Sequence, residues 1–503
     1  MFRLLCVVMM FAGSALVVPS SHAKDPFDLY VIIHGFQKPL AKPSSWPIDL
    51  MLVINENLET PDTGNRLTFA VVQPGKEDAP VYSKFLVYDW AKESNNFTNS
   101  TAKKLASDLA EKINARIEAH VKRTGDKINI HFISHSRGCY LSAYTMNDLL
   151  DRKAKGLTGF VQWTALDPHP LPGDGAIPIK SDPFFDWVTI FIQSTEKATV
   201  GEIDGKPISN NVSFDISNTL RKWKENDTNL NPNYHSLTHY WYHWMYNDGS
   251  LDIQYQDPVN QHIQSKLTPD LRKLLYGSST IVETFNTNEL HGFELFNNAK
   301  ALNGLVDLTG PEEWKIGSMW SKTHITGDFA VDFSFIIDNL KIGDVGQADG
   351  LTITLAPSNR ARGSGPGGSL GIEGITDSVS VAFDTYVNQE HNDPIRPWNY
   401  ISLRSGGSPK YIPILNRAAK LPEPSISGNK FLVRVACIAD KAMIRVYSFG
   451  QDKSTEVTLP LDPSWKRKIK DGVYVAFTAA TATGYESHKI IGPIIVAPAV
   501  YKD

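Results

Sequence analysis

The pattern of apolar and polar residues changes near residue 280. Before that point, short apolar runs typical of buried strands alternate with helix-like segments, and the runs lie at 29–33, 85–88, 128–133 and 160–166. Apolar residues also recur every four positions from Leu105 to Val121, which predicts an amphipathic helix that ends at Gly125. Strands that alternate with helices predict an α/β domain with a largely parallel sheet.

After residue 280 the pattern predicts strands without a helical stripe. Short segments rich in β-branched and aromatic residues are separated by Gly, Pro, Asn and Asp, which favour turns. These segments lie at 329–337, 351–355, 379–386, 431–438, 442–449, 473–477 and 490–496. The second half is therefore predicted to be a β-sandwich or jelly roll.

The sequence Ser134-His135-Ser136-Arg137-Gly138 joins the strand predicted at 128–133 to a helix predicted at 139–150. A strand, a sharp turn with a central Ser and a following helix form a nucleophile elbow, which lifts the Ser hydroxyl off the edge of the sheet. Ser136 is therefore the candidate nucleophile. Ser134 stands where the pattern expects Gly.

A serine nucleophile needs a base to take its proton and an acid to orient that base. Asp167 follows the strand predicted at 160–166, and His235 comes later, so the order Ser, acid, His expected of an α/β-hydrolase is kept. His239 and His243 follow His235 at intervals of four, as on one helix face, and compete with it as candidate bases.

The oxyanion formed during attack on a carbonyl needs preorganised donors. We expect these donors to be the backbone N–H groups of Arg137, just after the nucleophile, and of Phe36, in the loop after the first strand. This chemistry requires no metal or cofactor.

The N-terminus is typical of a secretory signal, predicted over residues 1–23. Arg3 precedes an apolar run over 4–18, and Ser21-His22-Ala23 resembles a cleavage site; a membrane anchor is the alternative. The product is therefore expected to be secreted or periplasmic, with no transmembrane segment after cleavage. Beyond the signal, Cys139 and Cys437 are expected to be buried free thiols, with an interdomain disulfide as the alternative.

Length and charge narrow the class of protein. A chain of 503 residues favours more than one domain, and we place the boundary between 24–278 and 279–503. The formal net charge of −4 gives no basic surface that would indicate a nucleic-acid partner.

Several motifs of the first half occur together: Ile32-Ile33-His34-Gly35-Phe36, Tyr88-Asp89-Trp90, the elbow, Ala165-Leu166-Asp167-Pro168, and the spacing from His235 to Trp241-Tyr242. Over about residues 29–245 they resemble the secreted lipases of the pancreatic-lipase-like group and their bacterial relatives. The resemblance implies that Ser136 is the nucleophile, Asp167 the acid and His235 the base. The insertion between Gln37 and Ser83 has no counterpart that we can place.

The second half contains, in order, Gly317 to Lys322, Ala348-Asp349-Gly350-Leu351, Gly367 to Gly371, Val381 to Asn388, and Val473 to Thr481. These segments resemble the legume-type (L-type) lectin fold, a jelly roll, over about residues 285–500. The resemblance implies that sugar is bound by Asp349, the Gly368 N–H, Tyr386 and Asn388, and that a cis peptide precedes Asp349.

The resemblance also implies a calcium site made by Asp384, the Tyr386 carbonyl, Asn388 and Asp393. An all-oxygen set of this kind suits calcium. The family's second, transition-metal site needs a Glu and a His where this chain has Ala382 and Tyr400, so we expect that site to be lost.

The combined prediction is an α/β-hydrolase domain followed by an all-β, lectin-like jelly-roll sandwich. We expect a secreted serine esterase or lipase that forms an acyl-Ser136 intermediate and is held on glycans by its lectin domain. One alternative is a carbohydrate-binding or adhesion protein with an inactive hydrolase half. Another is a carbohydrate esterase that acts on acylated glycans. A β-sandwich that binds no sugar is a further alternative for the second half.

Overall fold

The computed structural model describes most of the two predicted halves. The described residues are 27–35, 45–58, 69–76, 83–96, 99–169, 177, 179–193, 211–227, 232–246, 257, 280–283, 290–302, 304–338, 348–359, 362–393, 400–409, 419–420, 430–449, 453–484 and 486–502. The predicted signal, the domain boundary, Phe36 and about half of the insertion after Gln37 lie outside them.

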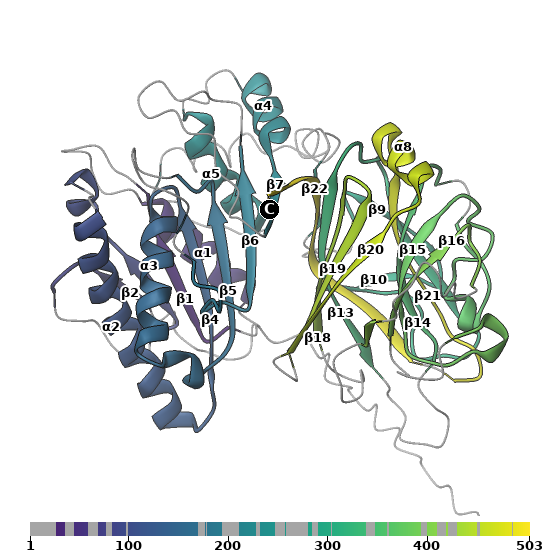
Figure 1. Ribbon diagram of the computed structural model, residues 1–503, viewed down its shortest axis with the longest axis horizontal. Coiled ribbons are helices and arrows are strands. Elements are labelled where there is room, and N and C mark those ends of the chain that lie inside the picture. Colours follow the sequence, from purple (N-terminus) through teal and green to yellow (C-terminus); the bar gives the residue numbers. More distant parts are fainter. Residues whose placement is uncertain are drawn as a thin grey trace, which may run out of the picture.

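The first half is built on parallel strands, as predicted (Figure 1). Their order across the sheet is β2 (Phe69–Val72), β3 (Phe85–Tyr88), β1 (Leu29–Ile33), β4 (Ile128–His135), β5 (Thr158–Leu166), β6 (Trp187–Ile192) and β7 (Asn211–Asp215). Strand β1 is buried along its whole length. Helices cover both faces of the sheet, and this explains why β1 is apolar at successive positions and does not alternate apolar with polar residues.

Two groups of helices bury the two faces. The helices α2 (Asn99–Thr124) and α3 (Gly138–Asp151) share a core with Val31 and Ile33, and the predicted stripe from Leu105 is the buried side of α2. The opposite face, with Tyr30 and Ile32, packs against α1 (Trp46–Leu58), α4 (Ser217–Asn226) and α5 (Tyr234–Tyr246). The alternation of side chains along β1 divides the two cores.

The second half is a sandwich of two antiparallel layers, which confirms the predicted β-sandwich. One layer contains β13 (Phe329–Asp338), β18 (Lys430–Ile438), β19 (Lys441–Ser448), β20 (Lys453–Pro460) and β22 (Ser487–Lys502). The short strands β8 (Ile281–Glu283) and β11 (Leu305–Asp307) pair with β22, and β10 (Lys300–Leu302) pairs with β11. The other has the order β17 (Ala419–Lys420), β16 (Tyr400–Ser405), β15 (Val379–Asp384), β14 (Gly350–Ala356), β21 (Tyr474–Ala480), β12 (Ile316–Ser321) and β9 (Phe293–Asn297).

Aromatic side chains fill the space between the layers. The rings of Phe333 and Phe477 meet edge to face with centroids 4.9 Å apart, and those of Phe335 and Phe383 lie 5.1 Å apart. Such pairs add to the stabilisation that comes from burying their area.

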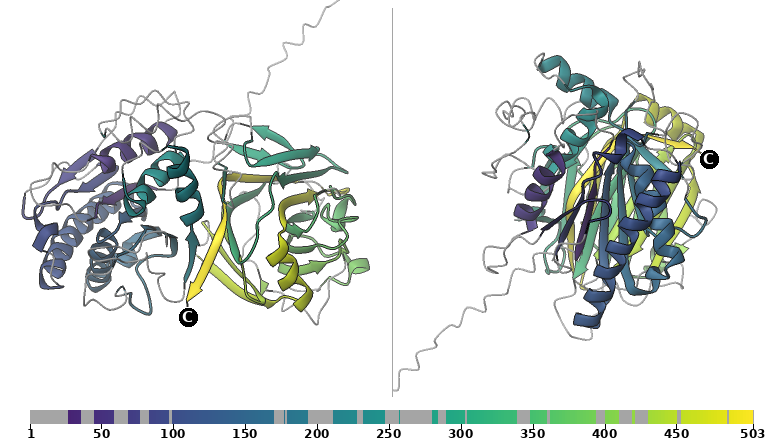
Figure 2. Two further views of the ribbon diagram at one scale, coloured as in Figure 1. Left: turned by 90° about the horizontal axis from the view of Figure 1, so that it is seen from above. Right: turned by 90° about the vertical axis from the view of Figure 1, so that its left-hand side faces the viewer.

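Strand β22 joins the halves into one continuous sheet (Figure 1). Its earlier residues pair with β13, and its last residues, from Ala499 to Lys502, pair antiparallel with β7. Viewed from above, the yellow C-terminal strand runs between the two halves (Figure 2, left). The end of the chain therefore covers a sheet edge that β7 would otherwise expose.

The structure corrects two expectations about the second half. It contains a helix, α8 (Pro463–Asp471), where we predicted strands alone. Asp462 caps this helix by accepting from the Ser464 N–H, and Trp465 and Ile469 bury one side of it. The sequence did not predict this helix, because two buried apolar positions are too few to establish a helical period. The strand predicted at 379–386 ends at Asp384, where the chain turns into a loop.

Cys139 and Cys437 are buried free thiols, as expected, and the alternative disulfide between them is not formed. No helix in the described part of the chain is long and apolar enough to cross a membrane.

A buried ion pair lies where the halves meet. The Arg434 Nε on β18 donates to Asp332 Oδ1 on β13 at 2.6 Å, and Arg434 Nη1 donates to the Val188 carbonyl on β6 at 2.9 Å. The guanidinium also lies over the Trp187 ring, 5.0 Å from its centroid. Arg434 thus links the sandwich to the parallel sheet through its charge and its donors.

We predict that Arg434→Gln lowers the free energy of unfolding by about 3–5 kcal/mol, because it leaves Asp332 buried without its cation. Urea denaturation of the full chain measures the change. Replacing the exposed Lys180 with Gln is the control, since its pair with Asp151 lies at the surface. A change below about 1 kcal/mol in Arg434→Gln would mean that the pair contributes little.

Candidate functional site

Ser136 lies in a tight turn between β4 and α3, where the elbow was predicted. Its φ is 58°, a left-handed conformation uncommon for a residue other than Gly, and its N–H donates to the Leu166 carbonyl at 2.9 Å. Gly138 is required at the turn, because a Cβ there would lie 2.6 Å from the His34 carbonyl oxygen. The turn therefore holds Ser136 above the carboxyl ends of β4 and β5.

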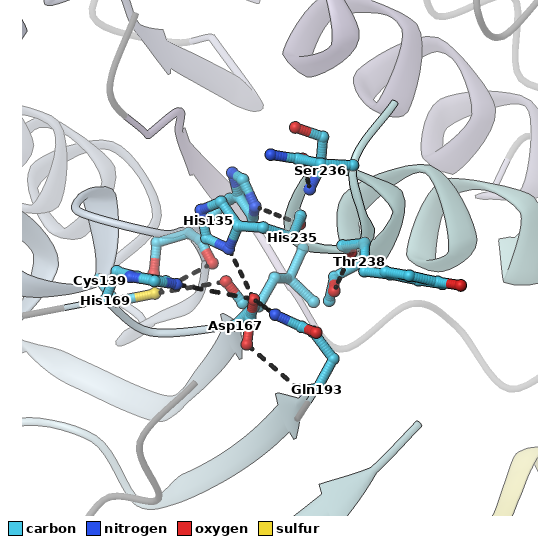
Figure 3. A network of polar contacts seen from close by, with 12 residues as sticks. His135, Cys139, Asp167, His169, Gln193, His235, Ser236 and Thr238 are labelled. Atoms are coloured by element: carbon cyan, nitrogen blue, oxygen red, sulfur yellow. Dashed lines mark hydrogen bonds and ion pairs between the residues drawn. The ribbon is translucent and has the colours of Figure 1, made fainter. Parts of the chain in front are cut away.

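Asp167 and His235 form the predicted pair (Figure 3). His235, near the start of α5, donates from Nδ1 to Asp167 Oδ2 at 2.6 Å. Asp167 follows β5, is fully buried, and also accepts from the Gln193 N–H at 3.2 Å and from Gln193 Nε2 at 3.0 Å. These donors hold the carboxylate in one orientation, so that it fixes the tautomer of His235.

The competing histidines do not reach Asp167 in this way. His239 stacks on Trp46 with centroids 4.6 Å apart, and burial lowers its pKa well below the usual value. His243 is also buried, and burial lowers its pKa to about 3. Of the three histidines on α5, His235 is the one that contacts the acid.

Two further histidines enclose this site. His135 Nε2 contacts the His235 carbonyl at 3.0 Å. The His169 N–H donates to the Ser136 carbonyl at 3.4 Å, and its ring lies 4.1 Å from that of His235. His169 thus lies between Ser136 and the pair formed by His235 and Asp167. Burial lowers the pKa of His169 to about 3.

The ligand atoms of Asp167, His169 and His235 lie within 4.8 Å of one another, close enough for a metal ion. The 2.6 Å contact between His235 and Asp167 already accounts for two of these groups. The arrangement is suited to proton transfer through a neutral imidazole held by a carboxylate. Arg137 directly follows Ser136 and precedes α3, as its predicted role requires, whereas the second predicted donor, Phe36, lies outside the described residues.

A second cluster lies at one end of the sandwich. It joins Asp349, which follows a cis peptide after Ala348 as expected, to Gly368 and Asn388. A Cβ on Gly368 would lie 2.3 Å from Asn388 Cγ, so the two residues are in close contact. Asp349 Oδ2 and Asn388 Oδ1 are buried without a hydrogen-bond partner among the described residues. Burial also raises the pKa of Asp349 to about 7.

Tyr386 lies on the loop that carries Asn388 and exposes an aromatic ring. Its side chain is 46% exposed, while its N–H donates to Asp384 Oδ1 at 3.1 Å. A sugar needs polar partners for its hydroxyls and an aromatic face for its C–H groups. Asp349, Gly368 and Asn388 therefore come together, with two acceptors that lack donors among the described residues, and the exposed Tyr386 lies on the same loop as Asn388.

The predicted calcium ligands also share one loop. Asp384 and Asp393 lie at its two ends, and Asp393 Oδ2 accepts from the Asn388 N–H at 2.8 Å. The unpartnered Asn388 Oδ1 fits a hard cation, and every donor in the set is oxygen. These residues fit calcium. The fully buried Arg404, which we did not predict to take part, contacts both carboxylates.

Comparison with known proteins bears on this half. A family model, the legume lectin domain, matches residues 284–493. The putative bark agglutinin LECRPA3 of Robinia pseudoacacia is 30% identical over 223 residues, which cover 40% of this chain and 74% of that protein. The chain belongs to the legume lectin family. A galactose-binding lectin of Arachis hypogaea is 30% identical over 173 residues, or 33% of this chain, and the chain spans 59% of that relative.

Solved structures of legume lectins match the same half. The lectin UEA-II complexed with galactose is 21% identical with a TM-score of 0.37, and the match covers 43% of this chain and 97% of that one. Basic winged bean lectin with Tn-antigen is 20% identical with a TM-score of 0.38, over 44% and 98%. The family model begins after the elbow, so carbohydrate binding is the function that membership supports, and it concerns the lectin half alone.

Two residues of the candidate sites, one in each half, were missed in the sequence. Gln193 follows β6, and a polar residue at the carboxyl end of a parallel strand was a signal that could have found it. The signal for Arg404 was weaker, because it was only a single charged residue in the otherwise uncharged strand β16. The fold alone shows that its partners are Asp384 and Asp393.

We predict that Gly368→Ala weakens glycan binding by at least about tenfold, because the new methyl group displaces Asn388. Isothermal titration with the best ligand from a glycan array measures this loss. Gly156→Ala is the control, because neither glycine has a positive φ and nothing lies within 4 Å of a Cβ added to Gly156. Equal affinities in the two variants would remove Gly368 from the binding site.

Proposed function

We propose that this protein is a glycan-binding serine ester hydrolase, in which an α/β-hydrolase domain cleaves a carboxylic ester and the lectin domain holds it on a glycan-bearing surface. The observation that carries the hydrolase part is the 2.6 Å contact of His235 with Asp167 beside the strained turn of Ser136. A merely structural serine does not need this combination of turn, buried acid and oriented imidazole.

In the proposed reaction, Ser136 Oγ attacks the ester carbonyl carbon while His235 Nε2 takes the hydroxyl proton. Asp167 holds the imidazole and stabilises the imidazolium that forms. The Arg137 N–H, with that of Phe36, stabilises the oxyanion. His235 then returns the proton to the leaving alkoxide. Water, activated by the same base, hydrolyses the acyl-Ser136 intermediate and restores the serine.

The lectin domain supplies attachment. Asp349, Gly368, Tyr386 and Asn388 would bind the sugar, and galactose is the first sugar to test because one relative is named for binding it. Binding at one site raises the concentration of ester near the other. The predicted signal adds a secreted or periplasmic location to the proposal.

Calcium belongs to the same proposal. Asp384, the Tyr386 carbonyl, Asn388 and Asp393 would hold the ion. When bound, it would order the loop that carries the sugar-binding side chains.

A carbohydrate-binding protein with an inactive hydrolase half is the second candidate, and it is favoured because the family match and the relatives named above concern lectins. A fluorophosphonate, which labels activated serines, separates the candidates. A preference for acetyl over long-acyl esters would point instead to an esterase of acylated glycans.

Ser136→Ala should abolish ester hydrolysis, with a loss of turnover on the order of a millionfold, and leave glycan binding intact. His235→Ala should approach this loss, because an unassisted hydroxyl is a weak nucleophile. His239→Ala, the matched control on the same helix, should stay within about tenfold of the wild type. Rates with p-nitrophenyl esters measure all three. Full activity in Ser136→Ala would exclude the mechanism, and the opposite ranking of the histidines would reassign the base.

Chelation should separate the two activities. EDTA should remove glycan binding reversibly and leave ester hydrolysis unchanged, because the proposed ligands lie in the lectin domain alone. Asp384→Ala should have the same effect on an array. Elemental analysis of untreated protein should find calcium. Unchanged glycan binding in EDTA, in protein that contains no calcium, would refute the proposed ion site.

A further inference from the structure

The loop from Asp384 to Asp393 places two carboxylates close together in the interior. Both side chains are fully buried, at 0% exposure, as is that of Arg404 on the adjacent strand β16. Two buried carboxylates destabilise one another unless a cation or a proton compensates them. The fold must therefore supply positive charge at this place.

Arg404 supplies it through a single nitrogen. Its Nη2 donates to Asp384 Oδ2 at 2.6 Å, to Asp393 Oδ1 at 3.1 Å and to the Tyr400 hydroxyl oxygen at 3.0 Å. The Tyr400 hydroxyl in turn contacts Asp384 Oδ2 at 3.1 Å. One nitrogen thus bridges the first and last acidic residues of the loop, as a shared metal ion would.

The remaining carboxylate oxygens organise the loop itself. Asp384 Oδ1 accepts from the Tyr386 N–H at 3.1 Å, and Asp393 Oδ2 accepts from the Asn388 N–H at 2.8 Å. The same acids therefore hold the backbone of both sugar-binding residues. By fixing the acids, Arg404 positions Tyr386 and Asn388.

The position of Arg404 is fixed by the sheet. In the pairing of β15 with β16, Arg404 lies opposite Ser380, and Tyr400 lies opposite Asp384. The side chain of Arg404 reaches back along the sheet to the end of β15. A guanidinium stays protonated in proteins, so this charge does not depend on the supply of ions.

We propose that Arg404 is a built-in cation that replaces a second metal ion, so that the lectin domain takes a single divalent ion and no transition metal. Ala382 and Tyr400 explain why ligands for such an ion are lacking, and Arg404 explains how the charge of the two acids is balanced without it. The inference deepens the proposed calcium and glycan site and rests on it for the role of the loop.

The test uses full-length wild type, Arg404→Gln and Arg404→Lys. Wild type loaded with calcium should bind one calcium per chain and show no stoichiometric site for Mn²⁺ by electron paramagnetic resonance. Arg404→Gln should lose at least about tenfold in glycan affinity. Its thermal midpoint should rise more on addition of Ca²⁺ or Mn²⁺ than that of the wild type, because a free ion then replaces the lost charge. Arg404→Lys, which keeps the charge, should lie closer to the wild type.

Arg434→Gln is the matched control, since it removes another buried arginine from its carboxylate. It should lower stability without changing the response to metals. A stoichiometric Mn²⁺ site in the calcium-loaded wild type would overturn the proposal, as would identical metal responses in wild type and Arg404→Gln. If Arg404→Gln does not fold, Mn²⁺ titration of the wild type and the behaviour of Arg404→Lys still decide. A wild type that binds no glycan would refute the proposed function alone, because metal stoichiometry and thermal shifts do not depend on glycan.

Discussion

The pairing of β22 with both halves is the constraint on which the architecture depends. One part of the strand pairs with β13 of the sandwich, and its last residues pair with β7 of the parallel sheet. Neither β13 nor β7 therefore has an unpaired edge where the two halves meet. An unpaired edge at either place would expose a row of backbone donors and acceptors. Arg434 and the apolar cluster of Phe160, Trp187 and Tyr447 fill the same junction with side chains from both halves.

At two places in this protein, a buried arginine balances the charge of buried carboxylates. Arg434 balances Asp332 at the junction, and Arg404 balances Asp384 and Asp393 at the two ends of the loop that follows β15. In each case strand pairing places the guanidinium, and the side chain crosses to an acid on a neighbouring strand. A buried pair of this kind contributes little net stability over an apolar one, but the loss of one partner is costly. Each arginine thus specifies an arrangement of strands more than it stabilises one.

The two candidate sites differ in what supports them. Family membership accounts for the lectin half and leaves the first half to be argued from its own residues. There the argument is geometric: a turn that lifts Ser136, an acid held by Gln193, and a histidine oriented by that acid. The two halves share one continuous sheet, which fixes the distance between the two candidate sites.

The sequence by itself determined the alternation of strands and helices in the first half, the strand pattern of the second half, and the candidate site residues Ser136, Asp167, Asp349, Gly368 and Asn388. Local patterns suffice for these, because an elbow or a glycine-rich loop imposes its conformation on a few adjacent residues. Helix α8, the choice of His235 over His239, and the roles of Gln193 and Arg404 were decided only by the tertiary structure. Each depends on which distant side chain it meets, and strand order, β22 included, is set by packing between segments far apart in the chain. No local period encodes that order.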